Sequence, residues 1–202
     1  MDVVAAPRRL SRERRREQLL DVTADLLMEG GFEAVTMEGV AARAGVSKGL
    51  GYAYFTNRDE LLATLYDREL GALDRAVLRA GAQADGSFAE RLEHILTAAF
   101  GVIAERGALI GALLQGKRDD GPLEDRRRRR QAAVEGYFVD LVVSEFGLAD
   151  RAAQAAVAFL LGAYSGALDL WVARRASRKE MIPAFVRFAV AGLEALASTA
   201  TG

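Results

Sequence analysis

Cysteine is missing from this chain of 202 residues. Its absence excludes disulfides, thiolate nucleophiles and cysteine-ligated metal sites, and it is typical of cytoplasmic proteins. Histidine is almost missing as well, because His94 is the sole example and no acidic cluster lies near it in the sequence. One histidine without such partners makes a poor metal site. We therefore expect neither a metal nor a cofactor.

Long apolar runs are also lacking, since no stretch approaches about 18 consecutive apolar residues, the length that suits a membrane span. The first residues, MDVVAAPRRL, lack the charged start and apolar centre of a secretory signal. We therefore expect a cytoplasmic protein with no membrane contact. The formal net charge is only −1, so any affinity for nucleic acid must come from a local basic patch.

Proline is scarce, with Pro7, Pro122 and Pro183 as the three examples, and no segment alternates strictly enough to predict a strand. Apolar residues instead recur at helical spacing along most of the chain. The sequence predicts an all-α fold of about nine helices, in a domain over residues 1–57 and a larger one over 58–202. The expected helices cover residues 12–29, 37–44 and 48–54, start near residues 58, 88, 122, 150 and 178, and include a short segment at 109–115.

Two of the expected helices are short and are joined by a tight turn at residues 44–47. Thr36 and Ser47 are good N-cap residues for them, and Gly45 suits the turn. A small residue, Ala41, stands where the two helices should approach each other. This is a helix-turn-helix pattern, in which the second helix enters the major groove of DNA with its N-terminal residues leading.

The leading residues of that second helix suit contact with DNA. Lys48 can donate to guanine or to a phosphate, and Leu50 can touch a thymine methyl group. Gly49 lets the backbone approach closely, and Tyr52 and Tyr54 can donate to phosphate oxygens. The residues that we expect at double-stranded DNA are Thr36, Ser47, Lys48, Gly49, Leu50, Tyr52, Tyr54, Arg58, Arg12 and Arg15.

Arginines gather in two runs, and each admits two readings. The first run includes Arg8, Arg9 and Arg12 and is either a solvated tail or a basic arm along DNA; we favour the arm, because the rest of the chain is not basic. The second run extends from Arg126 to Arg130, and its side chains point all round a helix. We favour a solvated helix start there, with recognition of an acidic ligand or partner as the alternative.

Residues 36–62, TMEGVAARAGVSKGLGYAYFTNRDELL, resemble the DNA-binding segment of the TetR family of bacterial transcription regulators. The shared features are a threonine, an alanine-rich second helix, Gly-Val-Ser, Tyr-x-Tyr-Phe, a basic residue and Leu-Leu. The resemblance covers about the first quarter of the chain. It implies a homodimer on a palindromic operator, most often a repressor, whose larger domain holds a small apolar effector and controls the spacing of the two half-sites.

One position departs from the family's pattern. A large apolar residue usually follows the position of Leu50, whereas this chain has Gly51. The staple that this residue would form with Val46 across the Ser47 cap is therefore lost. We predict a looser recognition helix, with a neighbouring side chain that fills the gap.

The expected larger domain supplies candidates for two further sites. Apolar residues on inward helix faces are candidates for a ligand pocket, although an ordinary core needs the same residues: Leu92, Ile95, Leu96, Phe100, Val134, Tyr137, Phe138 and Tyr164. The resemblance places a dimer bundle on the last two long helices, and small or apolar residues there suit such an interface: Phe159, Gly162, Gly166, Leu170, Phe185, Phe188 and Leu193.

Other functional classes find less support in the sequence. Ser165 and Asp169 share a helix face, but nothing supplies a base and an oxyanion hole, so we do not expect an enzyme. An architectural DNA-binding protein without an inducing ligand is the main alternative. A ligand-dependent activator is a second one, because the position of the operator, which the sequence does not contain, decides between activation and repression.

Overall fold

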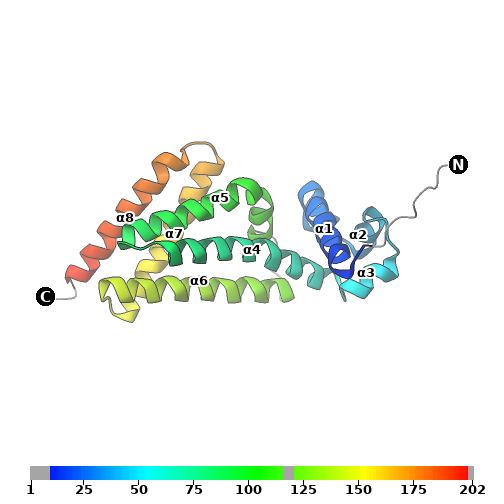
Figure 1. Cartoon of the computed structure of the whole chain (residues 1–202), viewed down its shortest axis with the longest axis horizontal. Coiled ribbons are helices and arrows are strands. Elements are labelled where there is room, and N and C mark those ends of the chain that lie inside the picture. The colour runs from blue at the N-terminus through cyan, green and yellow to red at the C-terminus, as the bar shows by residue number, and fades with distance from the viewer. Residues whose placement is uncertain (1–9, 116–120, 200–202) are drawn as a thin grey trace. The chain divides into compact units, whose positions relative to one another are not determined.

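The computed structural model describes residues 10–115 and 121–199, and all regular structure in these residues is α-helical (Figure 1). The all-α expectation is therefore confirmed, with eight helices in the described residues rather than about nine. The helices are α1 (Arg12–Ala34), α2 (Met37–Arg43), α3 (Lys48–Tyr54), α4 (Arg58–Gln83), α5 (Phe88–Gln115), α6 (Pro122–Phe146), α7 (Asp150–Val172) and α8 (Arg178–Thr199).

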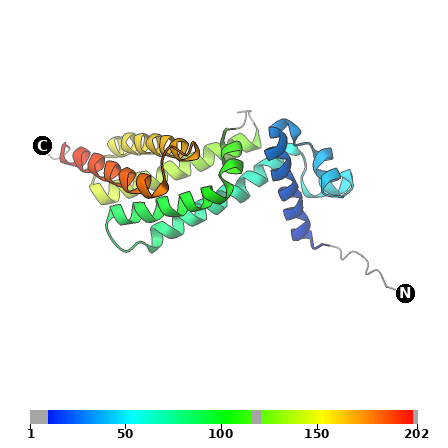
Figure 2. The ribbon, with the colours of Figure 1, turned by 90° about the horizontal axis from the view of Figure 1, so that it is seen from above.

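The chain forms two compact units. The first comprises Met1–Leu70 with Gly107–Arg126, and the second comprises Gly71–Arg106 with Arg127–Gly202. In the first unit α2 packs on both α1 and α3, whereas in the second α7 and α8 lie side by side (Figures 1 and 2).

Side-chain caps begin α2 and α3 where the sequence predicts them. The hydroxyls of Thr36 and Ser47 accept hydrogen bonds from the backbone N–H groups of Gly39 and Leu50, at 3.0 and 3.2 Å. Each cap satisfies a backbone donor that the first turn of a helix leaves without a partner. These caps set where α2 and α3 start, and so which side chains occupy their first turns.

Three helix ends differ from the expectation. The chain leaves helical geometry at Gly30 and Gly31, as expected, and Gly31 has a φ of 70°, but further helical turns carry α1 on to Ala34 rather than ending it at residue 29. The expected short helix at 109–115 is the end of α5, because no breaker separates it from the preceding residues. The residue type of Asp150 predicts a cap for the helix near residue 150, but Asp150 is the first helical residue of α7 and Ala149 precedes it without a side-chain cap.

The second unit is built round an apolar core between its helices. Phe88, Leu92, Leu96 and Phe100 of α5 are all at most 7% exposed, and residues of α6, α7 and α8 pack against them. The helical spacing of these four residues places them on one face of α5, which explains why the sequence pattern identifies the stripe correctly.

Three helices are long and apolar enough to cross a membrane by length and composition alone: Phe88–Leu114, Asp150–Val172 and Arg178–Ser198. The lack of long uninterrupted apolar runs in the sequence therefore does not exclude helices of this length and hydropathy. A few charged residues interrupt the apolar runs but leave the mean hydropathy of a helix high. Only 11% of the most apolar window of α7 is buried within the chain, against 39% for that of α5. The chain therefore leaves α7 with an apolar surface that its own core does not cover.

Candidate nucleic-acid interface

The turn between α2 and α3 has the geometry that the helix-turn-helix pattern requires. Gly45 has a φ of 66°, in the left-handed region that favours glycine. The backbone N–H of Val46 then donates to the carbonyl of Ala41 at 2.9 Å. This closed turn directs the start of α3 at a steep angle to α2.

Gly51 lies where α3 crosses α2, and it is buried. A Cβ built on Gly51 would lie 3.6 Å from the Cβ of Ala41 and 4.0 Å from the Cε of Met37. The two backbones therefore approach closely here, and the side chain of Met37 reaches into the space that a large residue would fill. Position 51 therefore has room for a methyl group, but a large side chain would fit only if Met37 moved.

The opposite face of α3 is open to solvent. Leu50 is 37% exposed and Tyr52 is 43% exposed, and nothing lies within 4 Å of a Cβ built on Gly49. Tyr54 is half-buried, whereas Phe55 is only 2% exposed and belongs to the core of the first unit. The residues predicted to lead toward DNA thus share one surface, with Tyr54 at its edge.

Lys48, the only lysine of that surface, has two partners within the chain. Its ammonium forms an ion pair with the carboxylate of Glu38, and it lies 5.8 Å from the centre of the Tyr52 ring. The hydrogen bond to Lys48 lowers the pKa of Glu38, and the hydrogen bond to Glu38 raises the pKa of Lys48. Both groups are charged at neutral pH. The ion pair joins the first turn of α2 to the first turn of α3, and sequence reasoning missed it because the two residues are ten positions apart.

Arg58, predicted to meet a phosphate, makes hydrogen bonds to the backbone of the first unit. Its Nε donates to the carbonyl of Val35 at 2.7 Å, and one terminal nitrogen donates to the carbonyl of Phe32 at 2.5 Å. These carbonyls lie at the end of α1, and that of Phe32 also accepts from the backbone N–H of Val35 at 3.2 Å. Arg58 therefore ties the start of α4 to the end of α1.

The basic segment before and within α1 is described only in part. Arg8 and Arg9 lie outside the described residues. Arg12 is exposed, whereas Arg15 is half-buried and donates to the side-chain oxygen of Gln18 at 2.6 Å. Arg16 lies 5.4 Å from the centre of the Phe55 ring, a contact that the sequence did not predict.

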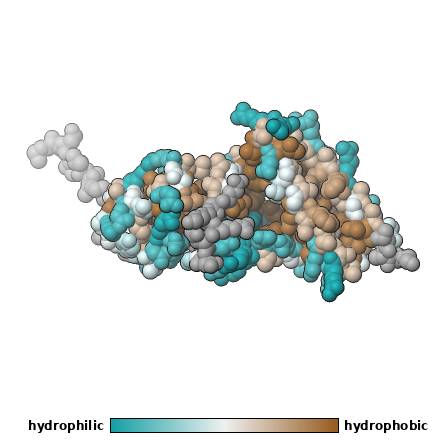
Figure 3. Space-filling model, turned by 180° about the vertical axis from the view of Figure 1, so that it is seen from behind, coloured by the Kyte–Doolittle hydropathy of each residue, from teal (hydrophilic) through white to brown (hydrophobic). Residues whose placement is uncertain are grey.

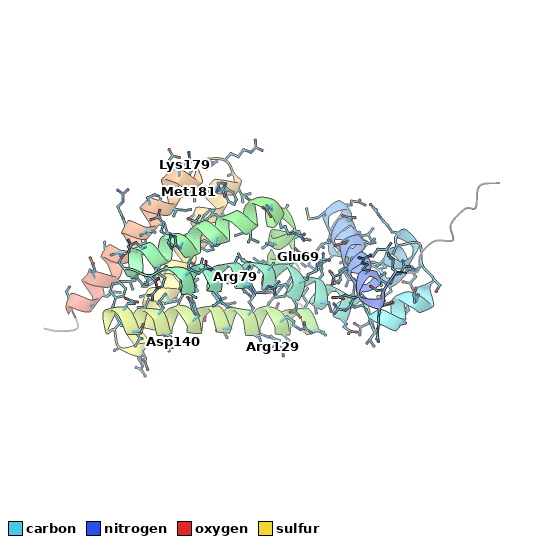
Figure 4. The ribbon with its side chains drawn as sticks, in the orientation of Figure 1. Glu69, Arg79, Arg129, Asp140, Lys179 and Met181 are labelled. Atoms are coloured by element: carbon cyan, nitrogen blue, oxygen red, sulfur yellow. The ribbon has the colours of Figure 1, made fainter. Side chains whose placement is uncertain are left out.

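A further cluster of charges connects α4 to α1 within the first unit. Arg68 donates to Glu17 at 3.1 Å, to Asp21 at 2.8 Å and to Glu69 at 2.8 Å. Glu69, labelled on α4 in Figure 4, is only 2% exposed. A buried carboxylate is stable only with such a charged partner. The spacing of Glu17 and Asp21, one helical turn apart, was the only sequence signal for this cluster.

The arginine run of α6 is not simply a solvated helix start. Arg126 pairs with Asp67 of α4 in the first unit, and Arg130 holds both carboxylate oxygens of Asp74 in the second, at 2.6–3.1 Å. Arg129 is exposed on the outer side of α6 (Figure 4). Residues four apart share a helix face, so two members of the run pair with α4 while a third faces solvent.

The ligand-pocket candidates lie in or beside the core of the second unit. Phe100 makes edge-to-face contacts with Tyr164 and Trp171, at centroid distances of 6.0 and 5.1 Å. Burial raises the pKa of Tyr164 to about 12. Leu92, Ile95 and Leu96 are buried, and Val134, Tyr137 and Phe138 are half-buried.

The dimer candidates divide into two groups. Phe159, Leu170 and Phe188 are 74%, 47% and 60% exposed, and Gly162 and Gly166 are exposed between the first two. Apolar residues cover much of this C-terminal part of the chain in Figure 3. Phe185 is half-buried against Tyr164, and Leu193 is only 1% exposed in the core. Leu193 therefore offers no surface to a partner, contrary to the expectation.

Three glycines of the helix-turn-helix motif should respond differently to substitution by alanine. Gly49→Ala and Gly51→Ala remove a residue with poor helix propensity and meet no clash, so each should slow hydrogen exchange of the α3 amides by roughly threefold to fivefold. Gly45→Ala forces a side chain into the left-handed region at a cost of about 1–2 kcal/mol, and it should accelerate that exchange.

Gly51→Leu is the informative control, because the larger side chain must displace Met37. It should destabilise α3 relative to Gly51→Ala. If Leu at position 51 instead slowed exchange more than Ala, the space beside Met37 would be a real vacancy, and the looser helix predicted from the sequence would be correct.

Comparison with protein-family models finds one match in the segment that carries this motif. Residues 19–65 match the model described as bacterial regulatory proteins, tetR family. The HTH-type transcriptional repressor KstR of Mycolicibacterium smegmatis is 39% identical over 82 residues, which cover 41% of this chain and 40% of that protein. The HTH-type transcriptional regulator BetI of Klebsiella pneumoniae is 40% identical over 83 residues, or 41% of this chain and 43% of that protein. The matched region thus spans about two fifths of each relative.

Solved structures extend the likeness to the whole fold. A transcriptional regulator of Pseudomonas aeruginosa PAO1 superposes with a TM-score of 0.79 at 23% identity, with 93% of each chain covered. A TetR-like transcriptional regulator of Rhodococcus sp. RHA1 superposes with a TM-score of 0.73 at 22% identity, with 92% of this chain and 98% of that chain covered. Residues 19–65 are therefore similar to the DNA-binding segment of the TetR family, and the chain as a whole has the fold of these solved structures.

Proposed function

We propose that this protein is a cytoplasmic, homodimeric repressor that binds a palindromic operator and is released from it by a small apolar molecule. The observation that carries the proposal is the exposed surface of α3, on which Lys48, Gly49, Leu50 and Tyr52 lie together while Gly51 and Phe55 face the core. Residues 1–57 form the DNA-binding domain and residues 58–202 the domain for ligand and dimer.

The roles at DNA follow from what each side chain contacts in the free protein. Leu50 and Gly49 face the floor of the major groove, and the phenol of Tyr52 donates to a phosphate. Thr36 and Ser47 act through their caps, which fix the first turns of α2 and α3. Arg58 contributes chiefly by holding α4 to α1, because its guanidinium donates to two backbone carbonyls.

The uncovered face of α7 and α8 supports the dimer. Phe159 and Phe188 are large, apolar and mostly exposed, and solvent contact of such side chains is unfavourable. A Cβ built on Gly162 or Gly166 would meet nothing within 4 Å, so a second chain could approach the backbone of α7 closely. A symmetric dimer presents two recognition helices, which must meet half-sites about one turn of DNA, roughly 34–36 Å, apart.

The effector acts by shifting a population of states. A ligand in the second unit favours a conformation in which the two DNA-binding domains no longer match the half-site spacing, and its effect equals its differential affinity for the two states. The aromatic group of Phe100, Tyr164 and Trp171 supports an apolar ligand, because it offers large apolar surfaces and a single hydroxyl.

The first prediction for this function concerns Tyr52. On DNA from upstream of the protein's own gene, wild type should bind saturably with a steep dependence on salt. Tyr52→Phe removes one hydrogen bond to phosphate and should weaken binding by roughly fivefold, without a change in sequence preference. Tyr137→Phe removes the same hydroxyl from the second unit and serves as the control. Equal affinity of Tyr52→Phe and wild type would exclude the proposed contact.

The second prediction concerns the dimer. Phe159→Glu or Phe188→Glu places a charge on the apolar face of α7 and α8, and sedimentation velocity should show conversion of a dimer to a monomer. Leu78→Glu, at a residue of α4 that is 50% exposed, should leave the dimer intact. A wild-type protein that sediments as a monomer and floats with phospholipid vesicles would assign the apolar helices to a membrane instead.

The third prediction separates an effector-controlled repressor from an architectural protein. In a thermal-shift screen of small apolar molecules, a compound that binds the folded state must raise the melting temperature. The same compound should lower the affinity for DNA. If compounds that raise the melting temperature leave DNA binding unchanged or strengthen it, the architectural or activator alternative is favoured.

A further inference from the structure

We propose that Glu38 and Lys48 act as one unit that reads a G·C base pair, with Glu38 as a specificity-determining residue. This inference rests on the proposed function, because it assumes that α3 enters the major groove. It assigns to this carboxylate a role beyond its ordinary stabilisation of the first turn of α2.

Glu38 lies in the first turn of α2, where the helix dipole favours an acidic residue, and it is also exposed beside the residues proposed to face DNA. Its side chain is 56% exposed, and its ion pair with Lys48 places it on the surface that carries Leu50 and Tyr52. Duplex DNA carries one negative charge per about 1.7 Å of helix axis, so an unpaired carboxylate at this surface would be repelled. A carboxylate that accepts hydrogen bonds from both Lys48 and a base avoids that repulsion.

The pair matches the edge of a G·C base pair in the major groove. Guanine presents the acceptors N7 and O6 there, and cytosine presents the N4 amino donor beside them. The ammonium of Lys48 only donates and the carboxylate of Glu38 only accepts. Guanine O6 and cytosine N4 are hydrogen bonded to each other, and the two side chains pair with each other, so the donor Lys48 can face O6 while the acceptor Glu38 faces N4.

The surrounding contacts hold the pair ready for this task. Thr36 and Ser47 cap the helices on whose first turns Glu38 and Lys48 stand, and the Tyr52 ring lies 5.8 Å from the ammonium. A pre-ordered pair loses less conformational freedom on binding than two independent long side chains. The pair also has no net charge, so Lys48 adds little to non-specific attraction for phosphates.

The opposing model is that DNA pulls Lys48 away from Glu38 toward a phosphate. The two models differ in what removal of the carboxylate does. If the pair reads a base pair, Glu38→Ala relaxes sequence preference at one position of each half-site. If Lys48 only binds phosphate, Glu38→Ala strengthens binding to every sequence and leaves the preference unchanged.

The test is selection from a library of duplexes with randomised base pairs, followed by sequencing, for the full-length wild type, Glu38→Ala, Glu38→Gln and Glu29→Ala. Wild type should select a G·C pair at one fixed position of each half-site, and Glu38→Ala should lose roughly tenfold discrimination at that position alone. Glu29 forms an exposed ion pair with Arg43 in the same unit, so Glu29→Ala is a matched loss of one paired carboxylate and should keep the wild-type preference.

Salt titration on the selected duplex gives an independent readout. Lys48→Ala should leave the slope of affinity against salt unchanged and relax the same base-pair position, whereas loss of a phosphate contact would reduce the slope by about one. Circular dichroism checks that each variant is folded. If Glu38→Ala does not fold, Glu38→Gln tests the same loss of charge with a side chain of nearly the same size.

Identical preferences of wild type, Glu38→Ala and Glu38→Gln would overturn the inference while the proposed function stood. A wild type that selects no motif would overturn both, and the two failures are therefore distinguishable.

Discussion

The close crossing of α2 and α3 is the constraint on which the proposed DNA surface depends. Ala41 and Gly51 are small, so the backbones of α2 and α3 approach closely where they cross. The side chain of Met37 fills the space beside Gly51. This crossing turns Gly51 and Phe55 inward and leaves Lys48, Gly49, Leu50 and Tyr52 outward. It also brings the first turns of the two helices together, without which Glu38 and Lys48 could not pair.

Arginine carries much of the connection between helices in this protein. Arg58 satisfies carbonyls at the end of α1, Arg68 joins α4 to two acidic residues of α1, and Arg130 holds Asp74 with two nitrogens. A guanidinium suits these tasks because its donors lie in a plane and match carbonyl or carboxylate oxygens in pairs. The abundance of arginine over lysine therefore has a structural use, and the exposed Lys48 stands apart as the lysine of the α3 surface.

The apolar content of the C-terminal helices has two uses. The face of α5 with Leu92, Leu96 and Phe100 is buried in the core of the second unit. The face of α7 with Phe159 and Leu170 is exposed in a single chain. Hydropathy cannot separate these uses, because a core, a partner chain and a membrane all remove apolar surface from water. Burial within the chain identifies the apolar residues of the core. The proposed dimer accounts for the apolar residues that remain exposed.

The sequence by itself determined the local features: the helical class, the caps at Thr36 and Ser47, the glycine turn at Gly45 and the buried stripe of α5. These depend on interactions between residues a few positions apart, so residue type and spacing suffice to predict them. Only the tertiary structure decided the packing of Gly51 on α2, the clamp of Arg58 and the pair of Glu38 with Lys48. It also showed that Leu193, which we expected at the dimer interface, is buried in the core of the second unit. Each of these outcomes depends on which helix faces meet, and the pattern along one helix does not contain the position of its neighbour.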